Sequence, residues 1–136
     1  MKRGGVSPAK RLRKEIDSIF SMFTRIRDKR RFGGLCVLCK TRPIEVCFHF
    51  LSRGNLKTRW NTDNSCGSCR GCNFNEAMDR KEVRKDFWKA HHIALVGIVT
   101  RETVEKEAHE IVKYDLGQLI AIRDNLKARL ELVCRQ

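Results

Sequence analysis

The sequence predicts an α+β protein that is mostly helical, with one small β-hairpin at a metal centre. Two observations predict this fold class. Both ends of the chain carry apolar residues at spacings of three and four, which is typical of amphipathic helices. The middle of the chain carries cysteines at CxxC intervals, which is typical of metal-binding knuckles. A chain of 136 residues is long enough for one domain with a modest core.

The first segment, residues 1–34, is expected to be a basic arm followed by an amphipathic helix. Ser7-Pro8 is typical of an N-cap with proline at the first helical position. Gly33-Gly34 is expected to end the helix. The inward face of this helix is expected to carry the apolar residues Leu12, Ile16, Ile19, Phe20, Phe23 and Ile26.

The second segment, residues 35–92, is expected to hold the metal centre. Its first part, from Cys36 to His49, is predicted to form two short extended pieces around a knuckle. A polar loop is expected from Arg53 to Asn64. A helix is expected to begin at Cys69 and to reach about Arg80, and residues 80–91 are expected to continue or restart it.

The third segment, residues 93–136, is predicted to be helical after a break near Gly97. One helix is expected from about Arg101 to Lys113. The last helix is expected from about Leu116 to Cys134, with Asp115 as its N-cap. Its inward residues are expected to be Leu119, Ile120, Leu126, Leu130 and Val133.

Charge is the second strong property of the chain, which has a formal net charge of +13. Residues 1–31 carry 11 Lys/Arg against 3 acids, whereas residues 73–136 carry 12 against 11. A polyanion, most simply nucleic acid, is the natural partner for such a field. The alternative is a basic surface that is merely solvated.

Other features limit where the protein acts. The longest apolar run, Ile93 to Val99, is too short to span a bilayer, so no membrane partner is expected. The start, MKRGG, has no apolar stretch typical of a secretory signal. Seven cysteines without such a signal indicate a reducing compartment, where metal binding is favoured over disulfides.

The cysteine spacing predicts a structural zinc ion held by two CxxC knuckles. Cys36 and Cys39 supply the first knuckle. The second could be Cys66 with Cys69 or Cys69 with Cys72, and spacing alone does not decide between them. The remaining cysteines, Cys47 and Cys134, are expected to be ordinary buried thiols.

The residues around the knuckles resemble the zinc-stapled HNH nucleases, also called ββα-metal nucleases, which share a treble-clef core. In that family a histidine, an asparagine five positions before the second knuckle, and a residue directly after this knuckle form the signature. His49, Asn64 and Asn73 fall on these positions. The resemblance therefore implies zinc ligands Cys36, Cys39, Cys69 and Cys72, and it makes Cys66 a bystander.

Two longer patterns sharpen the resemblance. CRGCNFNE, residues 69–76, is similar to the CxxCNxxE of recombination endonuclease VII. HFLSRG, followed by Arg59-Trp60, Asp63-Asn64 and CxxCN, is similar to the phage NinG (Rap) family of junction-specific endonucleases. The resemblance implies a metal-dependent endonuclease that cuts branched DNA of the Holliday-junction type during phage recombination. It also implies a place in the bacterial host cytoplasm.

The resemblance assigns roles to single residues. His49 would be the general base, and Asn73 would be a ligand of a catalytic Mg²⁺ or Mn²⁺, with Glu76 as a second ligand. Asn64 would fix the loop by hydrogen bonds to the backbone. Residues expected to contact DNA are Arg53, Lys57, Arg59, Trp60 and Arg70. Trp60 could stack on a base or could instead plug the core beneath the loop.

One position departs from the family. Many members carry Asp or His immediately before the catalytic histidine, where this chain has Phe48. Glu45 or Glu76 could substitute as ligand. Phe48 also favours an alternative function, a catalytically silent zinc module that binds nucleic acid or assists recombination or packaging.

Two further expectations concern the rest of the chain. His91 and His92 fit no ligand pattern and are expected at a helix end or on the surface. Because a four-way junction has two symmetry-related strands, a homodimer is expected. One or both of the first and last helices would form its interface through their apolar stripes. Alternatively, these two helices pack on each other within one chain.

Overall fold

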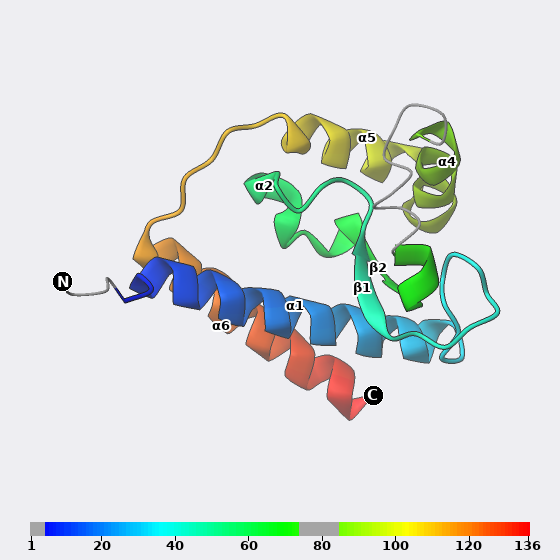
Figure 1. Cartoon of the computed structure of the whole chain (residues 1–136), viewed down its shortest axis with the longest axis horizontal. Coiled ribbons are helices and arrows are strands. Elements are labelled where there is room, and N and C mark those ends of the chain that lie inside the picture. Colours follow the sequence, from blue (N-terminus) through cyan, green and yellow to red (C-terminus); the bar gives the residue numbers. More distant parts are fainter. Residues whose placement is uncertain (1–4, 74–84) are drawn as a thin grey trace.

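The computed structural model describes residues 5–73 and 85–136. Helices dominate, and two short strands form an antiparallel sheet, so the α+β, mostly helical class is confirmed (Figure 1). In chain order the elements are α1 (Pro8–Arg31), β1 (Val46–His49), α2 (Leu56–Arg59), the 3₁₀ turn η1 (Thr62–Asn64), β2 (Ser65–Ser68), α4 (Lys85–Val96), α5 (Ile98–Ala108) and α6 (Leu116–Arg135). Residues 70–73 are also helical.

Helix α1 begins and ends as the sequence predicts. The hydroxyl of Ser7 accepts a hydrogen bond from the amide of Lys10, and Pro8 occupies the first turn. The helix gives way to Gly33 and Gly34, whose φ angles of 66° and 85° favour glycine. Four residues of the predicted apolar stripe are buried, namely Leu12, Ile16, Phe20 and Phe23. Ile19 and Ile26 are partly buried.

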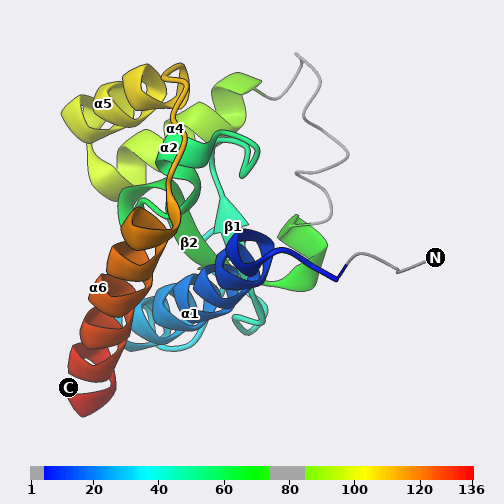
Figure 2. The same cartoon turned by 90° about the vertical axis from the view of Figure 1, so that its left-hand side faces the viewer.

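Helix α6 packs along α1, and Figures 1 and 2 show the pair from two directions. Asp115 caps α6 through a capping box with Gln118, as its predicted position requires. Leu119 and Leu126 join the core that contains the α1 stripe. Ile120, which was expected to face inward, is 38% exposed, so that expectation is wrong. The two long helices thus cover each other, which is the alternative to using their stripes for a dimer.

The β-hairpin is formed by strands that lie far apart in the sequence. Strand β1 pairs with β2, with Phe48 opposite Cys66 and His49 opposite Ser65. The sequence placed both extended pieces between Cys36 and His49, so the partner strand was wrong. Before β1, this part of the chain forms an isolated bridge between residues 35 and 43. The expected polar loop between the strands contains α2 and η1.

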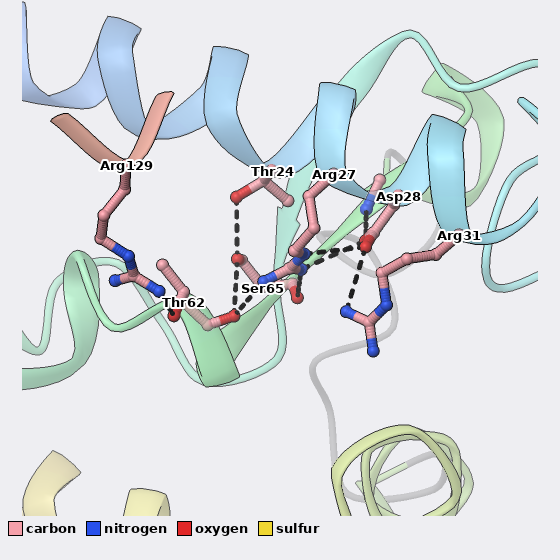
Figure 3. A network of polar contacts seen from close by, with 8 residues as sticks. Thr24, Arg27, Asp28, Arg31, Thr62, Ser65 and Arg129 are labelled. Carbon is pink, nitrogen blue, oxygen red and sulfur yellow. Dashed lines mark hydrogen bonds and ion pairs between the residues drawn. The ribbon is translucent and has the colours of Figure 1, made fainter. Parts of the chain in front are cut away.

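A buried polar network fixes β2 on α1 (Figure 3). Asp28 is fully buried and accepts hydrogen bonds from the amide of Gly67 at 2.7 Å and from the guanidinium of Arg27 at 2.8 Å. Thr24 and Ser65 share a further hydrogen bond of 2.9 Å between their hydroxyl groups. Because an unpaired buried carboxylate is costly, each partner of Asp28 is needed.

The same network reaches the turn before β2. Arg27 donates to the backbone carbonyls of Thr62 at 2.8 Å and Ser65 at 2.9 Å. Arg129, on α6, donates to the hydroxyl of Thr62 at 3.1 Å. Helices α1 and α6 therefore hold together the end of the polar loop and the start of β2 (Figure 3).

Helices α4 and α5 lie on the other side of the hairpin from α1 (Figure 1). Gly97, with φ of 90°, separates them at the predicted break. Helix α5 starts and ends earlier than predicted, because it follows Gly97 directly and ends at Ala108. The segment 109–115, expected to be partly helical, is an irregular connection that runs back to α6.

A second core joins the hairpin, the first knuckle and α4. Phe48 and Phe50 pack edge to face with ring centroids 5.0 Å apart, and Trp88 lies 5.3 Å from Phe48. The ring of His92 stacks on Phe50 at 4.2 Å and is fully buried. The expectation of a surface position for His92 is therefore wrong. Among the described helices, none is long and apolar enough to cross a membrane.

Candidate functional site

The sulfur atoms of Cys36, Cys39, Cys69 and Cys72 lie within 4.8 Å of one another. Four sulfurs around one zinc ion, each at about 2.3 Å, would lie roughly 3.8 Å apart, so the size of the cluster is compatible with a tetrahedral site. The backbone amides of Cys39 and Cys72 donate to the sulfurs of Cys36 at 3.5 Å and Cys69 at 3.4 Å. This grouping of four cysteines is confirmed, and it could hold a structural metal such as zinc.

Two thiols of the cluster have pKa values shifted in opposite directions. Hydrogen bonds from the backbone of Arg42 and Thr41 lower the pKa of Cys39 to about 6. Burial, together with the neighbouring thiols, raises the pKa of Cys72. Several thiolates cannot share this small space without a positive ion, because like charges repel strongly at such distances. A divalent ion would allow all four to ionise.

The other cysteines play no part in this cluster. Cys66 is buried in β2 opposite Phe48, and burial raises the pKa of its thiol. Cys47 is partly buried, and burial raises its pKa to about 11. Cys134 is exposed on α6, so the expectation that it is buried is wrong. Cys66 is the bystander that the resemblance implied.

His49, at the end of β1, is held in a defined orientation. Its ring stacks on Phe20 of α1 with centroids 5.4 Å apart. Its Nε2 lies 2.9 Å from the backbone carbonyl oxygen of Arg59. Because a carbonyl oxygen only accepts hydrogen bonds, Nε2 carries the proton and Nδ1 keeps a free lone pair. Burial, together with the charges of Arg53 and Arg59, lowers the pKa of His49 below its ordinary value.

Asn64 supports the loop that returns from β1 to β2. It is fully buried, and its carboxamide oxygen accepts from the amide of Leu51 at 2.9 Å. Its amide group donates to the carbonyls of Leu51 at 3.1 Å and Thr58 at 3.2 Å. Asn64 therefore makes backbone hydrogen bonds of the kind expected of it. Its effect on His49 is indirect, because Thr58 precedes the residue that holds the histidine.

A cavity of about 460 Å³ brings His49 and Asn73 together. Glu45 and Arg53 line the same cavity, and its opposite wall is α1. Asn73 lies in the helical residues 70–73, directly after the cysteine cluster. Asn64 does not line the cavity. Glu76, the expected second ligand, lies outside the described residues.

Oxygen donors for a second metal are few in the described part of the chain. Phe48 is fully buried in the core, so it faces away from His49, as alternation along a strand requires. Glu45 lines the cavity and pairs with Arg70 at 3.0 Å. Within residues 5–73 and 85–136, the four cysteines are the one group of three or more potential ligands among His, Cys, Asp and Glu.

Two of the three arginines expected to contact DNA, Arg53 and Arg59, converge on one carboxylate that the sequence reasoning missed. Asp17 of α1 accepts from Nε of Arg59 at 3.0 Å, from Arg53 at 2.9 Å and from the indole of Trp60 at 2.9 Å. Burial raises the pKa of Asp17, but these donors outweigh it and lower the pKa below its ordinary value. A signal existed in the sequence, since residues 1–31 contain only 3 acids.

The remaining predicted contact residues have different surroundings. Trp60 is buried in the core between α1 and α6, so it plugs the core and offers no exposed face for base stacking. Lys57 lies 4.0 Å from Glu110, a loose and exposed ion pair. Arg70 keeps an exposed side chain beside the cysteine cluster. Lys57 and Arg70 are therefore accessible to a ligand.

The comparisons with known proteins assign no role to the residues of this site. No protein-family model, curated protein or solved structure matches the chain. Two features of the site therefore rest on the chain alone: a four-cysteine cluster that could hold a metal, and a cavity that places a neutral histidine near an asparagine. What these features do together is a question of chemistry.

Proposed function

We propose that this protein is a metal-dependent DNA endonuclease of the HNH type that hydrolyses phosphodiester bonds in branched DNA. The observation that carries the proposal is the cavity that both His49 and Asn73 line. The cysteine cluster supports it, because it ties the first knuckle to the start of the helix that bears Asn73. The resemblance to phage junction nucleases supplies the substrate class and a bacterial cytoplasm as the place of action.

His49 would act as the general base. Its proton sits on Nε2, so Nδ1 can take a proton from an attacking water molecule. Its lowered pKa keeps the ring neutral at pH 7, which is the form that a base needs. Because only the neutral form accepts the proton, cleavage should be independent of pH above about 6.5 and should decrease below the pKa of His49.

Asn73 and Glu45 would provide oxygen donors for a catalytic ion. Both line the cavity of His49, and Mg²⁺ and Mn²⁺ prefer such oxygen ligands. When bound, the ion would supply Lewis-acid stabilisation of charge on the phosphate and the leaving oxygen. Arg53, at the same cavity, would bind a neighbouring phosphate oxygen through its guanidinium.

The second candidate is a catalytically silent zinc module that binds nucleic acid. The burial of Phe48 favours it, because that position can supply no metal ligand. Both candidates share the cysteine cluster and the positive charge. They differ in whether His49 takes part in the cleavage of a phosphodiester bond.

The experiment that separates them uses supercoiled plasmid and a synthetic four-way junction, each with Mg²⁺ or Mn²⁺. The nuclease should cut at least one of them, and His49→Ala should reduce the rate by about 10² or more, because a general base contributes about that much. Binding to the junction and metal content should remain. His109→Ala, at an exposed histidine, is the matched control and should cut normally. Absence of cleavage by the wild type, with binding retained, supports the silent module.

A homodimer remains part of the proposal, because resolving a four-way junction requires two coordinated cuts. Its interface would have to use surfaces other than the apolar stripes of α1 and α6, which cover each other. Light scattering should report two chains per particle at micromolar concentration with junction DNA. A monomer with and without the junction contradicts the dimer.

A further inference from the structure

The cavity that holds His49 continues along α1. A second and more open hollow of about 390 Å³ lies beside it, and Asp17, Ser21, Arg25 and Arg53 line both. Lys14 lines the second hollow but not the cavity of His49. Because they share four lining residues, the two hollows form one groove. We call it the α1 groove.

One face of α1 forms a wall of this groove. Lys14, Ser18, Ser21 and Arg25 recur at spacings of four, three and four, so they lie on one side of the helix. This side is opposite the apolar stripe that packs on α6. At 1.5 Å per residue, Lys14 and Arg25 are about 16 Å apart along the helix. Two cations are thus separated by small hydroxyl side chains, which leave room for a chain of phosphates.

The positive charges of Lys14 and Arg25 are not used in ion pairs within the described fold. In the part of the chain that the structure describes, neither Lys14 nor Arg25 has an acidic partner, and Arg25 makes only a 3.3 Å hydrogen bond to the carbonyl of Ser21. Other arginines of α1 are used internally, since Arg27 and Arg31 bind Asp28. Two acids line the groove. Asp17 is paired with Arg53 and Arg59, and Glu45, in the cavity of His49, is paired with Arg70.

We propose that the α1 groove binds the sugar–phosphate backbone of one DNA strand, with Lys14 and Arg25 on phosphates next to the one presented to His49. This inference rests on the proposed nuclease function for the role of His49. The binding itself requires only an anionic strand, because Lys and Arg contact phosphates without reading the sequence. Ser18 and Ser21 would add hydroxyl hydrogen bonds to phosphate oxygens.

The test measures DNA binding without cleavage. A labelled 30-base-pair duplex and a four-way junction are titrated with the full-length protein at several salt concentrations, with no added Mg²⁺ or Mn²⁺. A chelator is omitted, because it would compete for metal at the cysteine cluster. The double variant Lys14→Gln, Arg25→Gln is compared with Lys106→Gln, Lys113→Gln. The control removes two exposed charges outside the groove.

The groove variant should lose at least tenfold in affinity at 150 mM salt. Its slope of log affinity against log salt should decrease by about 2, since each neutralised phosphate contributes about 0.9. The control should keep the wild-type slope. Any of three results would contradict the proposal that the groove binds DNA. These are equal slopes for the wild type and the groove variant, an equal loss of affinity in the control, or no DNA binding by the wild type.

The two proposals can fail separately. If the salt slope of the groove variant decreases by about 2 but the wild type cuts no DNA with Mg²⁺ or Mn²⁺, the groove proposal is supported and the nuclease proposal is contradicted. If the wild type cuts DNA but the salt slopes of the wild type and the groove variant are equal, the nuclease proposal is supported and the groove proposal is contradicted. Circular dichroism of each variant, with wild-type helix content, shows that a loss of binding is not a loss of fold.

Discussion

The backbone carbonyl of Arg59 holds Nε2 of His49 at 2.9 Å, while the side chain of the same arginine binds Asp17 of α1. The indole of the next residue, Trp60, binds the same carboxylate. Asp17 thus fixes the dipeptide whose carbonyl sets the tautomer of the histidine. A carboxylate on a helix remote in sequence therefore supports the contact from which the tautomer of His49 follows.

Replacing this carboxylate tests the relationship. Asp17→Asn removes the charge and leaves one acceptor for four donated hydrogen bonds, so the free energy of unfolding should decrease by about 2 kcal/mol. The Nε2–H tautomer of His49 should also become less dominant, which ¹⁵N chemical shifts of its ring report directly. Urea unfolding measures the first effect and NMR the second.

The control for Asp17 is another acid of the same helix. Glu15 makes looser ion pairs with Arg123 at 3.8 Å and Lys127 at 3.5 Å. Glu15→Gln should cost about 0.5 kcal/mol or less, because exposed pairs contribute little. Equal losses in the two variants would show that Asp17 has no special role.

The stability of the fold should depend on the protonation of His92 below about pH 6.5. Nε2 of His92 donates to the carbonyl of Asp63 at 2.6 Å, and Arg101 donates to its Nδ1 at 3.1 Å. Burial, together with the charge of Arg101, lowers the pKa of His92 below 6.5. The unfolded chain therefore takes up a proton first as the pH decreases. Stability should be complete above about 6.5 and should decrease from there toward the pKa of the folded state.

Urea unfolding at pH 8, 7, 6 and 5 checks this dependence. His92→Gln should flatten the decrease, and the remainder should come from His49, whose pKa is lowered in the same direction. The carboxyls of Asp17 and Glu105, whose pKa values are also lowered, lose their contribution only at more acidic pH. His109→Gln, at an exposed histidine, should leave the slope unchanged. An unchanged slope in His92→Gln would rule out this explanation.

The cysteine cluster makes a sharp prediction about metal content. Cys69→Ser should release the ion and destabilise the fold, because three sulfurs and a hydroxyl bind zinc poorly. Cys66→Ala should keep one ion per chain, although it removes a fully buried sulfur. Elemental analysis of the purified variants measures both. Loss of the ion in Cys66→Ala but not in Cys69→Ser contradicts the assignment.

Gly67 marks a close approach between β2 and its surroundings. A Cβ atom there would lie 2.9 Å from Ile44 and 3.2 Å from the Cβ of Asp28. Gly67→Ala should therefore destabilise the protein by about 1–3 kcal/mol through overpacking. Gly54→Ala is the control, since its added Cβ would meet only Ser52 at an ordinary 3.4 Å. Thermal unfolding of both variants tests the difference, and equal melting temperatures would contradict it.

The sequence predicted the elements whose signals are local. The apolar spacing and the caps at Ser7 and Asp115 gave α1 and α6 nearly to the residue. The knuckles of the cysteine cluster were equally visible, although spacing left Cys66 and Cys72 as alternatives. The resemblance selected Cys72, and the geometry agrees.

The elements that the sequence missed are imposed by tertiary contacts. Strand β2, Ser65–Ser68, contains no β-branched or aromatic residue, so its propensity for a strand is low. Pairing with β1 and the hydrogen bond from Gly67 to Asp28 hold it extended. Asp17 was missed for a similar reason, because its partners are 36 to 43 residues away along the chain.

The packing of α1 along α6 limits the order in which the chain can fold during synthesis, because α1 cannot complete its core before α6 has been made. Residues on α6, such as Leu119 and Leu126, supply the facing side of the α1 core, and the hydrogen bond from Arg30 to the carbonyl of Cys134 closes a loop of 104 residues. The sulfurs of Cys39 and Cys69 are only 30 residues apart, so the cysteine cluster can close much earlier. A nascent chain can therefore close the cysteine cluster while the side of α1 that α6 covers is still exposed. We expect this strongly basic helix to bind non-native partners, ribosomal RNA among them, until α6 has been synthesised.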